Sequence, residues 1–326
     1  MAKGLSSAVT VALTSACVLA LPAPAGASGP PLDVPGSALG RALDCHGALG
    51  ARGPTPVLLV RGTTLTPNVN FSWNYEKVFS AAGRPCCAVD IPDHGMGDVQ
   101  VAAEYVVYAL RTMAERADRR VSVVGYSQGG MSPRWALKWW PDTRDLVDDL
   151  VSIDGSNHGT LDTVATCALA CAPSLWQQDH RSRFLAVLNA GRETYAGISY
   201  TQLYSDLDEI VVPNFGPAAS TALHTGPGEI SNVAVESVCP LHVAEHVTMG
   251  TVDPVAYALV DDALTHPGPA DPHRIPRSVC RQVLMPGVDP VSATAGELRV
   301  VAQAGTQLGL YPHVAHEPPL ARYARP

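Results

Sequence analysis

Residues 125–129, with the sequence Gly-Tyr-Ser-Gln-Gly, constrain the fold of this chain more than any other segment. They follow the apolar run at residues 121–124 and open a helical pattern at residues 128–140. The turn must be tight enough to push the Ser127 hydroxyl clear of the strand. Glycine is needed at residues 125 and 129, because a side chain at either position would collide with neighbouring backbone. The helix directs its free N–H groups and positive dipole end toward the place where an oxyanion would form. The segment therefore predicts a strand–turn–helix unit with Ser127 as a catalytic nucleophile.

Strand-type and helix-type patterns alternate along most of the chain. Short apolar runs indicate buried strands, and apolar residues spaced three or four apart indicate amphipathic helices. Besides the segments around Ser127, strands are predicted at residues 57–60, 87–91, 150–154, 199–203 and 230–238, and helices at residues 99–116 and 253–264. This alternation indicates an α/β fold with a mainly parallel central sheet, right-handed crossovers and helices on both faces.

The size and charge of the chain fit one globular enzyme domain. Its 326 residues are enough to bury a large core. The 22 basic and 30 acidic residues give a formal net charge of −8, and a nucleic-acid partner would require a basic stripe that the sequence lacks. We therefore expect no nucleic-acid partner.

Residues 1–27 have the features of a secretory signal peptide. Lys3 supplies the positive charge, residues 8–21 are mostly apolar but too short to span a bilayer, and residues 25–27 form an Ala-Gly-Ala cleavage site. No later run is long and apolar enough for a membrane helix. We expect a secreted, soluble protein in which residues 28–326 form a single domain.

Export changes the expected state of the cysteines. Cys17 leaves with the signal peptide, and in an oxidising compartment the remaining cysteines pair by default, with one left over. A zinc site is the alternative, but no cysteine pair has a second, well-spaced pair of ligands, and we expect no metal there. The cysteines concerned are Cys45, Cys86, Cys87, Cys167, Cys171, Cys239 and Cys280.

Two loops late in the chain supply candidate partners for Ser127. A serine nucleophile needs a histidine base and an acid that orients it, and after this kind of turn the order is Ser, acid, His. The loop after the strand at residues 199–203 offers Asp206 and Asp208, and a later loop offers His242 and His246. Residue type and order alone do not choose within either pair.

Four polar residues near the second strand suggest a cation site as an alternative use of that segment. Asp90, Asp93, His94 and Asp98 have suitable side chains. The Ile-Pro-Asp-His-Gly sequence at residues 91–95 fits a turn that lines the cleft better, and we expect no metal here either.

Three tryptophans lie on the helix that follows Ser127. Trp135, Trp139 and Trp140 could form a wall for an acyl chain, but aromatic side chains at such positions more often pack a helix onto a sheet. We favour packing.

Several short segments carry distinctive sequences. Residues 59–64 read Leu-Val-Arg-Gly-Thr-Thr, residues 126–130 read Tyr-Ser-Gln-Gly-Gly, and residues 172–178 read Ala-Pro-Ser-Leu-Trp-Gln-Gln. Others lie at residues 104–105, 203–205, 208–211, 238–241 and 323–326. In these segments the sequence resembles the secreted lipases of the Candida antarctica lipase B family, which have the α/β-hydrolase fold. The segments are distributed over nearly the whole predicted mature chain, so the resemblance covers nearly all of it.

The resemblance implies roles for particular residues. It places the catalytic acid at Asp208 and the catalytic histidine at His246, and it assigns the oxyanion hole to the N–H of Gln128 and to the N–H and hydroxyl of Thr63. Ser127 would attack an ester carbonyl to form an acyl-enzyme, which water then hydrolyses. No metal ion or organic cofactor is needed for this chemistry, and we expect none.

The resemblance also implies two disulfides. One joins Cys239 to Cys280, and the other joins Cys45 to Cys87 or Cys86. Ungapped spacing favours Cys87, whereas a preceding proline favours Cys86.

Two departures from the family concern the mouth of the site. Arg61 replaces a proline of the oxyanion loop, which we expect to place a cation beside the mouth. Residues 161–171 match a short mobile helix at the entrance and contain Cys167 and Cys171. A disulfide between them would tighten or end a helix there. We expect this bond to form, to restrain the rim and to leave the site permanently accessible.

Together these features indicate a secreted carboxylic-ester hydrolase that acts as a monomer, a lipase or esterase on triacylglycerols or other apolar esters. The alternatives are a polyesterase or an acyltransferase on the same triad. In a different class, the alternative is a catalytically silent hydrolase fold that serves as a binding protein.

Overall fold

A seven-stranded sheet forms the centre of the molecule. The computed structural model describes Met1, residues 28–50 and residues 52–325, so the predicted signal peptide lies, apart from Met1, outside the described residues. The strand order is β1-β3-β2-β4-β5-β6-β7, and every neighbouring pair is parallel except β1 with β3. The strands are β1 Leu43–His46, β2 Val57–Val60, β3 Cys86–Val89, β4 Val121–Tyr126, β5 Val147–Ile153, β6 Ser199–Tyr204 and β7 Glu229–Ala234. This confirms the predicted α/β fold with a mainly parallel sheet.

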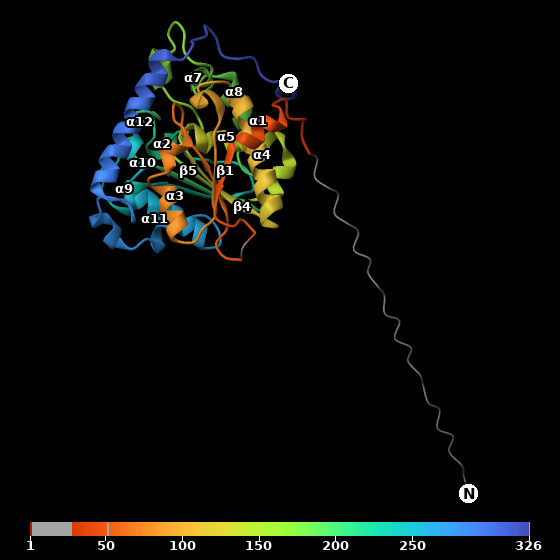
Figure 1. Cartoon of the computed structure of the whole chain (residues 1–326), viewed down its shortest axis with the longest axis vertical. Helices are drawn as coiled ribbons and strands as arrows, with labels where there is room; N and C mark the ends of the chain where they lie inside the picture. The colour runs from red at the N-terminus through yellow and green to blue at the C-terminus, as the bar shows by residue number, and fades with distance from the viewer. Residues whose placement is uncertain (2–27, 51, 326) are drawn as a thin grey trace.

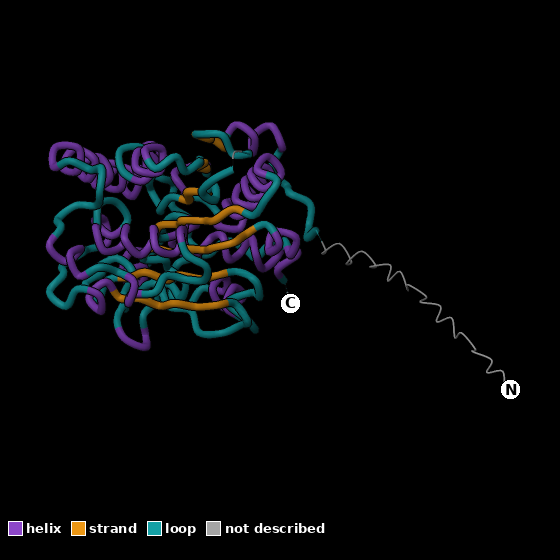
Figure 2. The backbone as a smooth tube through the Cα atoms, turned by 90° about the horizontal axis from the view of Figure 1, so that it is seen from below, coloured by secondary structure: helices purple, strands orange, loops and turns teal. Residues whose placement is uncertain are grey.

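Helices cover both faces of the sheet, as Figures 1 and 2 show. One face carries α1 Gly36–Arg41, α4 Val99–Ala117, α5 Gln128–Trp139 and α8 Arg183–Asn189. The other carries α2 Pro67–Phe71, α3 Tyr75–Ala81, α9 Val235–Val238, α10 His246–Met249, α11 Pro254–Thr265 and α12 Pro290–Leu310. The short helices α6 Asp162–Thr166 and α7 Pro173–Gln177 lie in the long connection between β5 and α8. No helix in the described part of the chain combines the length and the apolar run that crossing a membrane requires.

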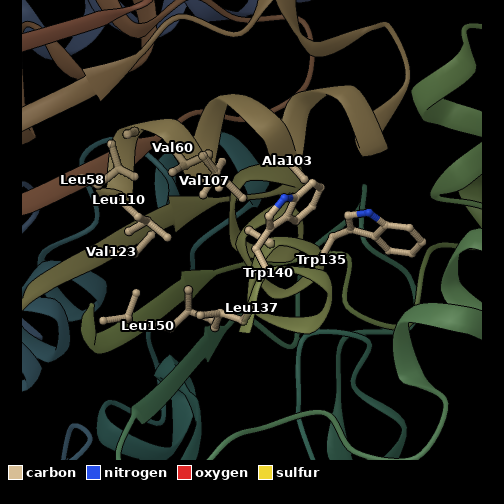
Figure 3. Close-up of a cluster of buried hydrophobic side chains, with 14 of the residues drawn as sticks. Leu58, Val60, Ala103, Val107, Leu110, Val123, Trp135, Leu137, Trp140 and Leu150 are labelled. Atoms are coloured by element: carbon tan, nitrogen blue, oxygen red, sulfur yellow. The ribbon is translucent and has the colours of Figure 1, made fainter. Parts of the chain in front are cut away.

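Each face of the sheet has its own buried core. Leu58 and Val60 of β2 pack on one side, and the alternate residues of the same strand pack on the other. Figure 3 shows Trp135 of α5 and Trp140, which directly follows that helix, in the first core, where both side chains are fully buried. Trp135 also stacks on Phe184 of α8, with ring centroids 4.3 Å apart. Trp135 and Trp140 therefore pack α5 onto its neighbours, which confirms the packing interpretation for these two residues.

The pleat of β3 decides which cysteine pairs with Cys45. Cys45 of β1 lies directly opposite Cys87 in the antiparallel register, and the structure joins these two. Cys86 points to the opposite face, because successive side chains of a strand alternate, and it is buried there as a free thiol. Two further disulfides join Cys167 with Cys171 and Cys239 with Cys280.

Most predicted elements agree with the structure to within three residues at their ends. The prediction of one strand over residues 230–238 was wrong in its second half, because β7 ends at Ala234 and residues Val235–Val238 form α9. The edge strand β1 and the long helix α12 were not predicted.

The proline-rich segments before α1 and after α12 pack against Trp140, which follows α5, and against α4. Trp140 Nε1 donates to the carbonyl of Pro30 at 2.8 Å, and the N–H of Ala321 donates to Gln100 Oε1 at 2.7 Å. These contacts tie the proline-rich segments at both ends to the domain.

Candidate active site

Ser127 lies on a sharp turn between β4 and α5. Its φ of 55° and ψ of −124° are unusual for a residue other than glycine. The turn is held in place because the Ser127 N–H donates to the carbonyl of Ile153, on the adjacent strand, at 2.8 Å. Strained backbone of this kind concentrates at functional sites, where the surrounding structure stabilises it.

The two glycines around Ser127 are required by close backbone contacts. A Cβ on Gly125 would lie 1.9 Å from the carbonyl oxygen of Gly129, and a Cβ on Gly129 would lie 2.0 Å from that of Val60. The second contact also fixes the distance between α5 and the end of β2. Both contacts agree with the steric argument made from the sequence.

His246 lies between Ser127 and Asp208. Its Nε2 is 3.2 Å from Ser127 Oγ, and its Nδ1 is 3.0 Å from Asp208 Oδ2. A carboxylate can only accept hydrogen bonds, so Nδ1 carries the proton and Nε2 is free to accept the hydroxyl proton of the serine. The arrangement has the geometry of a serine nucleophile, a general base and an orienting acid.

The Asp208 carboxylate is held by donors from its own loop. The N–H groups of Ile210 and Val211 donate to Oδ1 at 2.9 and 2.8 Å, and Asn214 Nδ2 donates to Oδ2 at 3.0 Å. Together with His246 they fix the carboxylate in position and favour its ionised form.

The pKa values of this pair are shifted in opposite directions. Burial alone would raise the pKa of Asp208, but His246 and the backbone N–H groups hold it below its ordinary value. Burial alone would lower the pKa of His246, but the Asp208 carboxylate, with Glu209 and Glu245, outweighs this and raises it. The environment thus favours an ionised acid beside a histidine of increased basicity.

The alternative acid and histidine lie elsewhere. Asp206 is exposed. His242 pairs with Asp253, whose carboxylate caps the N-terminus of α11. The structure therefore brings Asp208 and His246, and neither alternative, to Ser127.

Thr63 lies in the loop after β2, and two glutamine side chains hold its hydroxyl. Gln128 Nε2 and Gln178 Nε2 donate to Thr63 Oγ1 at 3.3 and 3.2 Å. The same nitrogens also donate to the carbonyls of Gly95 and Ser174, which fixes the orientation of both amides. Because Thr63 Oγ1 accepts from both, its own proton remains available to a bound oxyanion.

The backbone N–H of Gln128 is the second candidate donor. Gln128 is the first residue of α5, and the first N–H groups of a helix have no acceptor within the helix. The helix dipole adds partial positive charge at the same place. The predicted oxyanion residues therefore lie in the loop after β2 and at the N-terminus of α5, beside Ser127.

Arg61 is buried below the oxyanion loop, so the prediction of a cation at the mouth was wrong. Its side chain is 1% exposed and donates to the carbonyls of Gly62 and Ile91. Burial lowers its pKa to about 10, although Asp90 acts in the opposite direction. The guanidinium thus supports the oxyanion loop from its buried side through these two hydrogen bonds.

A cavity of about 220 Å³ opens at Ser127 and His246. Its charged lining residues, apart from His246, are Asp162 and Glu209. The rim includes α6, which ends at Thr166 just before the Cys167–Cys171 disulfide. Aliphatic side chains supply much of the wall: Leu65, Leu175, Ile210, Val211, Val247, Val300, Ala304 and Leu308.

The predicted turn near β3 forms, but its side chains do not line this cavity. Residues Pro92–Gly95 make a single tight turn in which Asp93 and His94 have positive φ. Among the residues that the structure describes, one group of three potential metal-binding side chains gathers its donor atoms within 4.8 Å, and it is Asp154, Asp208 and His246. The acidic segment around the turn does not form such a group.

Asp154 and Asn214 contribute to the site and were not singled out from the sequence. Asn214 bridges two carboxylates, donating to Asp208 and to Asp154. No local motif marks either residue, since each reaches the site only through the packing of β5 and β6. Gln178 lies in a segment that already resembled the family.

Comparisons with known proteins agree with this geometry. A family model described as Lipase (class 2) matches residues 54–226. Lipase B of Pseudozyma (Candida) antarctica is 35% identical over 254 residues, which cover 75% of this chain and 72% of that protein.

Solved structures extend the comparison. The crystal structure of Aspergillus fumigatus lipase B has a TM-score of 0.85 and 33% identity, covering 95% of this chain and 75% of that one. A Bacillus licheniformis lipase in its propeptide form has a TM-score of 0.50 at 15% identity, covering 70% of this chain and 54% of that one, and shares the fold alone. With the family model and the 35% identical lipase, these likenesses show that the chain belongs to the class 2 lipase family of the α/β-hydrolase fold.

Proposed function

We propose that this carboxylic-ester hydrolase cleaves apolar esters, acylglycerols among them, with Ser127 as nucleophile, His246 as general base and Asp208 as orienting acid. The observation that carries the proposal is the continuous chain from Ser127 Oγ to His246 Nε2, and from His246 Nδ1 to Asp208, at the base of a largely apolar cavity. This combination supports acyl transfer from an ester without a metal ion or an organic cofactor.

The reaction follows from the position of each proton. His246 Nε2 accepts the Ser127 proton as Oγ attacks the ester carbonyl, and Asp208 stabilises the imidazolium that forms. The negative charge on the carbonyl oxygen is met by the N–H groups of Thr63 and Gln128 and by the Thr63 hydroxyl. The imidazolium then protonates the departing alcohol, and a water molecule releases the acyl group by the same proton path.

The apolar wall and the acidic rim support uncharged substrates. Aliphatic side chains favour an acyl chain, whereas Asp162 and Glu209 repel a carboxylate at the mouth. A polyesterase or an acyltransferase would use the same triad. The ratio of acyl transfer to water and acyl transfer to an added alcohol separates an acyltransferase from a hydrolase.

We further propose that residues 28–326 form one secreted, monomeric catalytic domain. Three disulfides support an oxidising compartment. Contacts of the segments at residues 28–35 and 311–325 with Trp140 and with α4 support a single unit.

Serine replacement tests the proposal. Ser127→Ala should lower kcat by several orders of magnitude on p-nitrophenyl esters, because the nucleophile is removed. Ser132→Ala is the matched control, since Ser132 lies on α5 with a buried hydroxyl that has no partner among the described residues. Equal activity of both variants would mean that Ser127 is not the nucleophile. No hydrolysis by the wild-type protein, across acyl lengths and both below and above substrate solubility, would favour the silent binding protein.

A further inference from the structure

A second aspartate lies beneath the proposed triad, and the mechanism above does not use it. Asp154 follows β5 directly, between the strands that carry Ser127 and Asp208. Its N–H donates to the carbonyl of Leu203 on β6 at 2.8 Å. Its φ of 45° lies in the left-handed region, which Asp and Asn tolerate better than most residues. The carboxyl ends of three adjacent parallel strands thus bring Asp154 to the site.

The two oxygens of Asp154 have different environments. Oδ1 accepts from the N–H of Ser205 and from Asn214 Nδ2, each at 3.2 Å. Oδ2 has no hydrogen-bond partner among the described residues and lies 3.9 Å from His246 Nδ1. The side chain is fully buried, so water does not reach it from the surface. A buried oxygen without a donor is the one that carries a proton most readily.

Asp154 and Asp208 cannot both be ionised at moderate cost. Their carboxyl oxygens lie within 4.8 Å of one another in a buried cluster with His246. Asp208 accepts from two backbone N–H groups and from His246, which favours its ionised form. Burial, followed by the field of Asp208, raises the pKa of Asp154 well above its ordinary value. Two buried carboxyl groups at this distance favour a state with one proton between them, and the donors to Asp208 favour its residence on Asp154.

We propose that Asp154 is a second, protonated acid of the site, which donates its Oδ2 proton to the Asp208 carboxylate and replaces Asp208 as the partner of His246 when Asp208 is neutralised. The inference rests on the proposed Ser127–His246–Asp208 triad and adds a positioning residue to it. In the resting enzyme the donated hydrogen bond keeps the Asp208 carboxylate within hydrogen-bond distance of His246 Nδ1. When the charge of Asp208 is removed, Asp154 loses the neighbour that kept it protonated. Its Oδ2 proton passes to His246 Nδ1, His246 releases a proton from Nε2 to the solvent of the cavity that it lines, and Asp154 becomes the carboxylate that faces Nδ1.

The surrounding charges act on the same equilibrium. Tyr126 packs against the His246 ring, with centroids 5.0 Å apart, and its hydroxyl donates to the His246 carbonyl. Glu209 and Glu245 raise the pKa of His246, and Asp253 adds to the field that keeps Asp154 protonated. These groups remain in every variant below, so differences between variants report the two aspartates.

A double-mutant cycle tests the proposal with purified enzyme. The variants are Asp208→Asn, Asp154→Asn and both together, with kcat/KM measured across pH on a soluble ester. Asparagine accepts the positive φ at residue 154 and presents an N–H where the acid presents an O–H, so the fold is retained. Circular dichroism and the thermal midpoint check this for each variant.

The expected pattern is a residual activity that depends on Asp154. An Asp→Asn change in a triad without a second acid costs about 10⁴-fold. Here Asp208→Asn should cost about 10²-fold, with activity rising with pH as Asp154 ionises. The double variant should fall at least about tenfold further and lose that rise. Asp154→Asn alone should reduce kcat/KM several-fold and move its acid limb to higher pH. The amide N–H is a weaker donor to Asp208 than the carboxylic O–H, so Asp208 keeps more negative charge toward His246, which becomes more basic.

A matched control separates this effect from the loss of any buried acid. Asp149 lies on β5, the strand that Asp154 follows. It accepts a hydrogen bond from Ser122 Oγ, and burial raises its pKa to about 7. Asp149→Asn combined with Asp208→Asn should show the same kcat/KM as Asp208→Asn alone. A further fall equal to that caused by Asp154→Asn would overturn the specific role of Asp154.

The remaining outcomes are decisive. Equal residual activity of Asp208→Asn with and without Asp154→Asn would overturn the inference and leave the triad standing. A loss from Asp154→Asn as large as that from Asp208→Asn would show that Asp154 is ionised in the wild type, and would also overturn it. Wild-type kcat/KM in Asp208→Asn would overturn the triad itself. The proton NMR signal of His246 Nδ1–H should remain far downfield in Asp208→Asn and disappear in the double variant.

Discussion

Removing the hydroxyl of Thr63 is the sharpest test of the oxyanion site. Thr63→Val keeps the backbone N–H and the branched shape of the side chain but removes the donor. Because Gln128 and Gln178 donate to Thr63 Oγ1 at 3.3 and 3.2 Å, the hydroxyl proton is free to bind the developing charge. A donor of this kind is worth about 3 kcal/mol in the transition state. At about 1.4 kcal/mol per factor of ten, kcat should fall about 10²-fold.

The same change also affects the folded state. One N–H of each glutamine amide loses its acceptor, while the other keeps the carbonyl of Gly95 or Ser174. An unsatisfied buried N–H costs about 1–3 kcal/mol, so the unfolding midpoint should fall as well. Kinetics must therefore be measured well below that midpoint.

The assay is the separation of kcat from KM on a soluble p-nitrophenyl ester. Thr63→Val should lower kcat with little change in KM, because the lost interaction forms mainly in the transition state. Thr63→Ser keeps the hydroxyl and should retain most of kcat. An unchanged kcat in Thr63→Val would refute the role of the hydroxyl, and a raised KM with unchanged kcat would assign it to ground-state binding.

Three further predictions use other parts of the site. Asp208→Asn should lower kcat/KM at least about 10²-fold, whereas Asp206→Asn, at an exposed position, should change it by no more than about twofold; the reverse ranking in parallel assays would contradict the assignment. His246 must be neutral to accept the serine proton and its pKa is raised, so kcat/KM should fall as pH falls through a midpoint above about 6.5, and a pH profile with a lower midpoint would oppose this. Non-reducing peptide mapping should find Cys167 linked to Cys171. Wild-type activity should rise little when the substrate passes its solubility limit, whereas the variant with both cysteines changed to serine should show a larger rise. Free thiols in the wild type, or a sharp activation at the oil–water interface, would refute the restrained rim.

The sequence was most informative where local geometry and function coincide. The turn around Ser127 is visible in the chain because Gly125 and Gly129 have no room for a side chain. Parallel strands covered on both faces are continuous apolar runs, which made β2 and β4 predictable.

Other elements lacked such a pattern. The edge strand β1 is only partly buried. Helix α12 buries Ala293, Gly296 and Val300 and leaves larger apolar residues exposed, so its inner face is hard to recognise. Its N-terminus was nevertheless detectable, since Asp289 caps it and a proline follows.

The site was predictable in its chemistry but not in its supports. Residue order restricted the acid and the base to two candidates each, and the family resemblance chose between them. Asp154 and Asn214 reach the carboxyl edge through sheet order and loop packing, which are tertiary facts. Arg61 was misplaced for the same reason, because only the fold shows that its side chain turns under the loop.

The most direct test of the account is the identification of the residue that a serine-directed alkyl phosphonate modifies. The phosphonate imitates the tetrahedral intermediate and requires an activated hydroxyl, so mass spectrometry of the digested protein should find one adduct, on Ser127. Labelling should slow by orders of magnitude in His246→Ala, because the base that activates the hydroxyl is gone. Rapid labelling of another residue in the wild-type protein would contradict the proposed mechanism. A Ser127→Ala variant that remains active and is still fully labelled would contradict it as well.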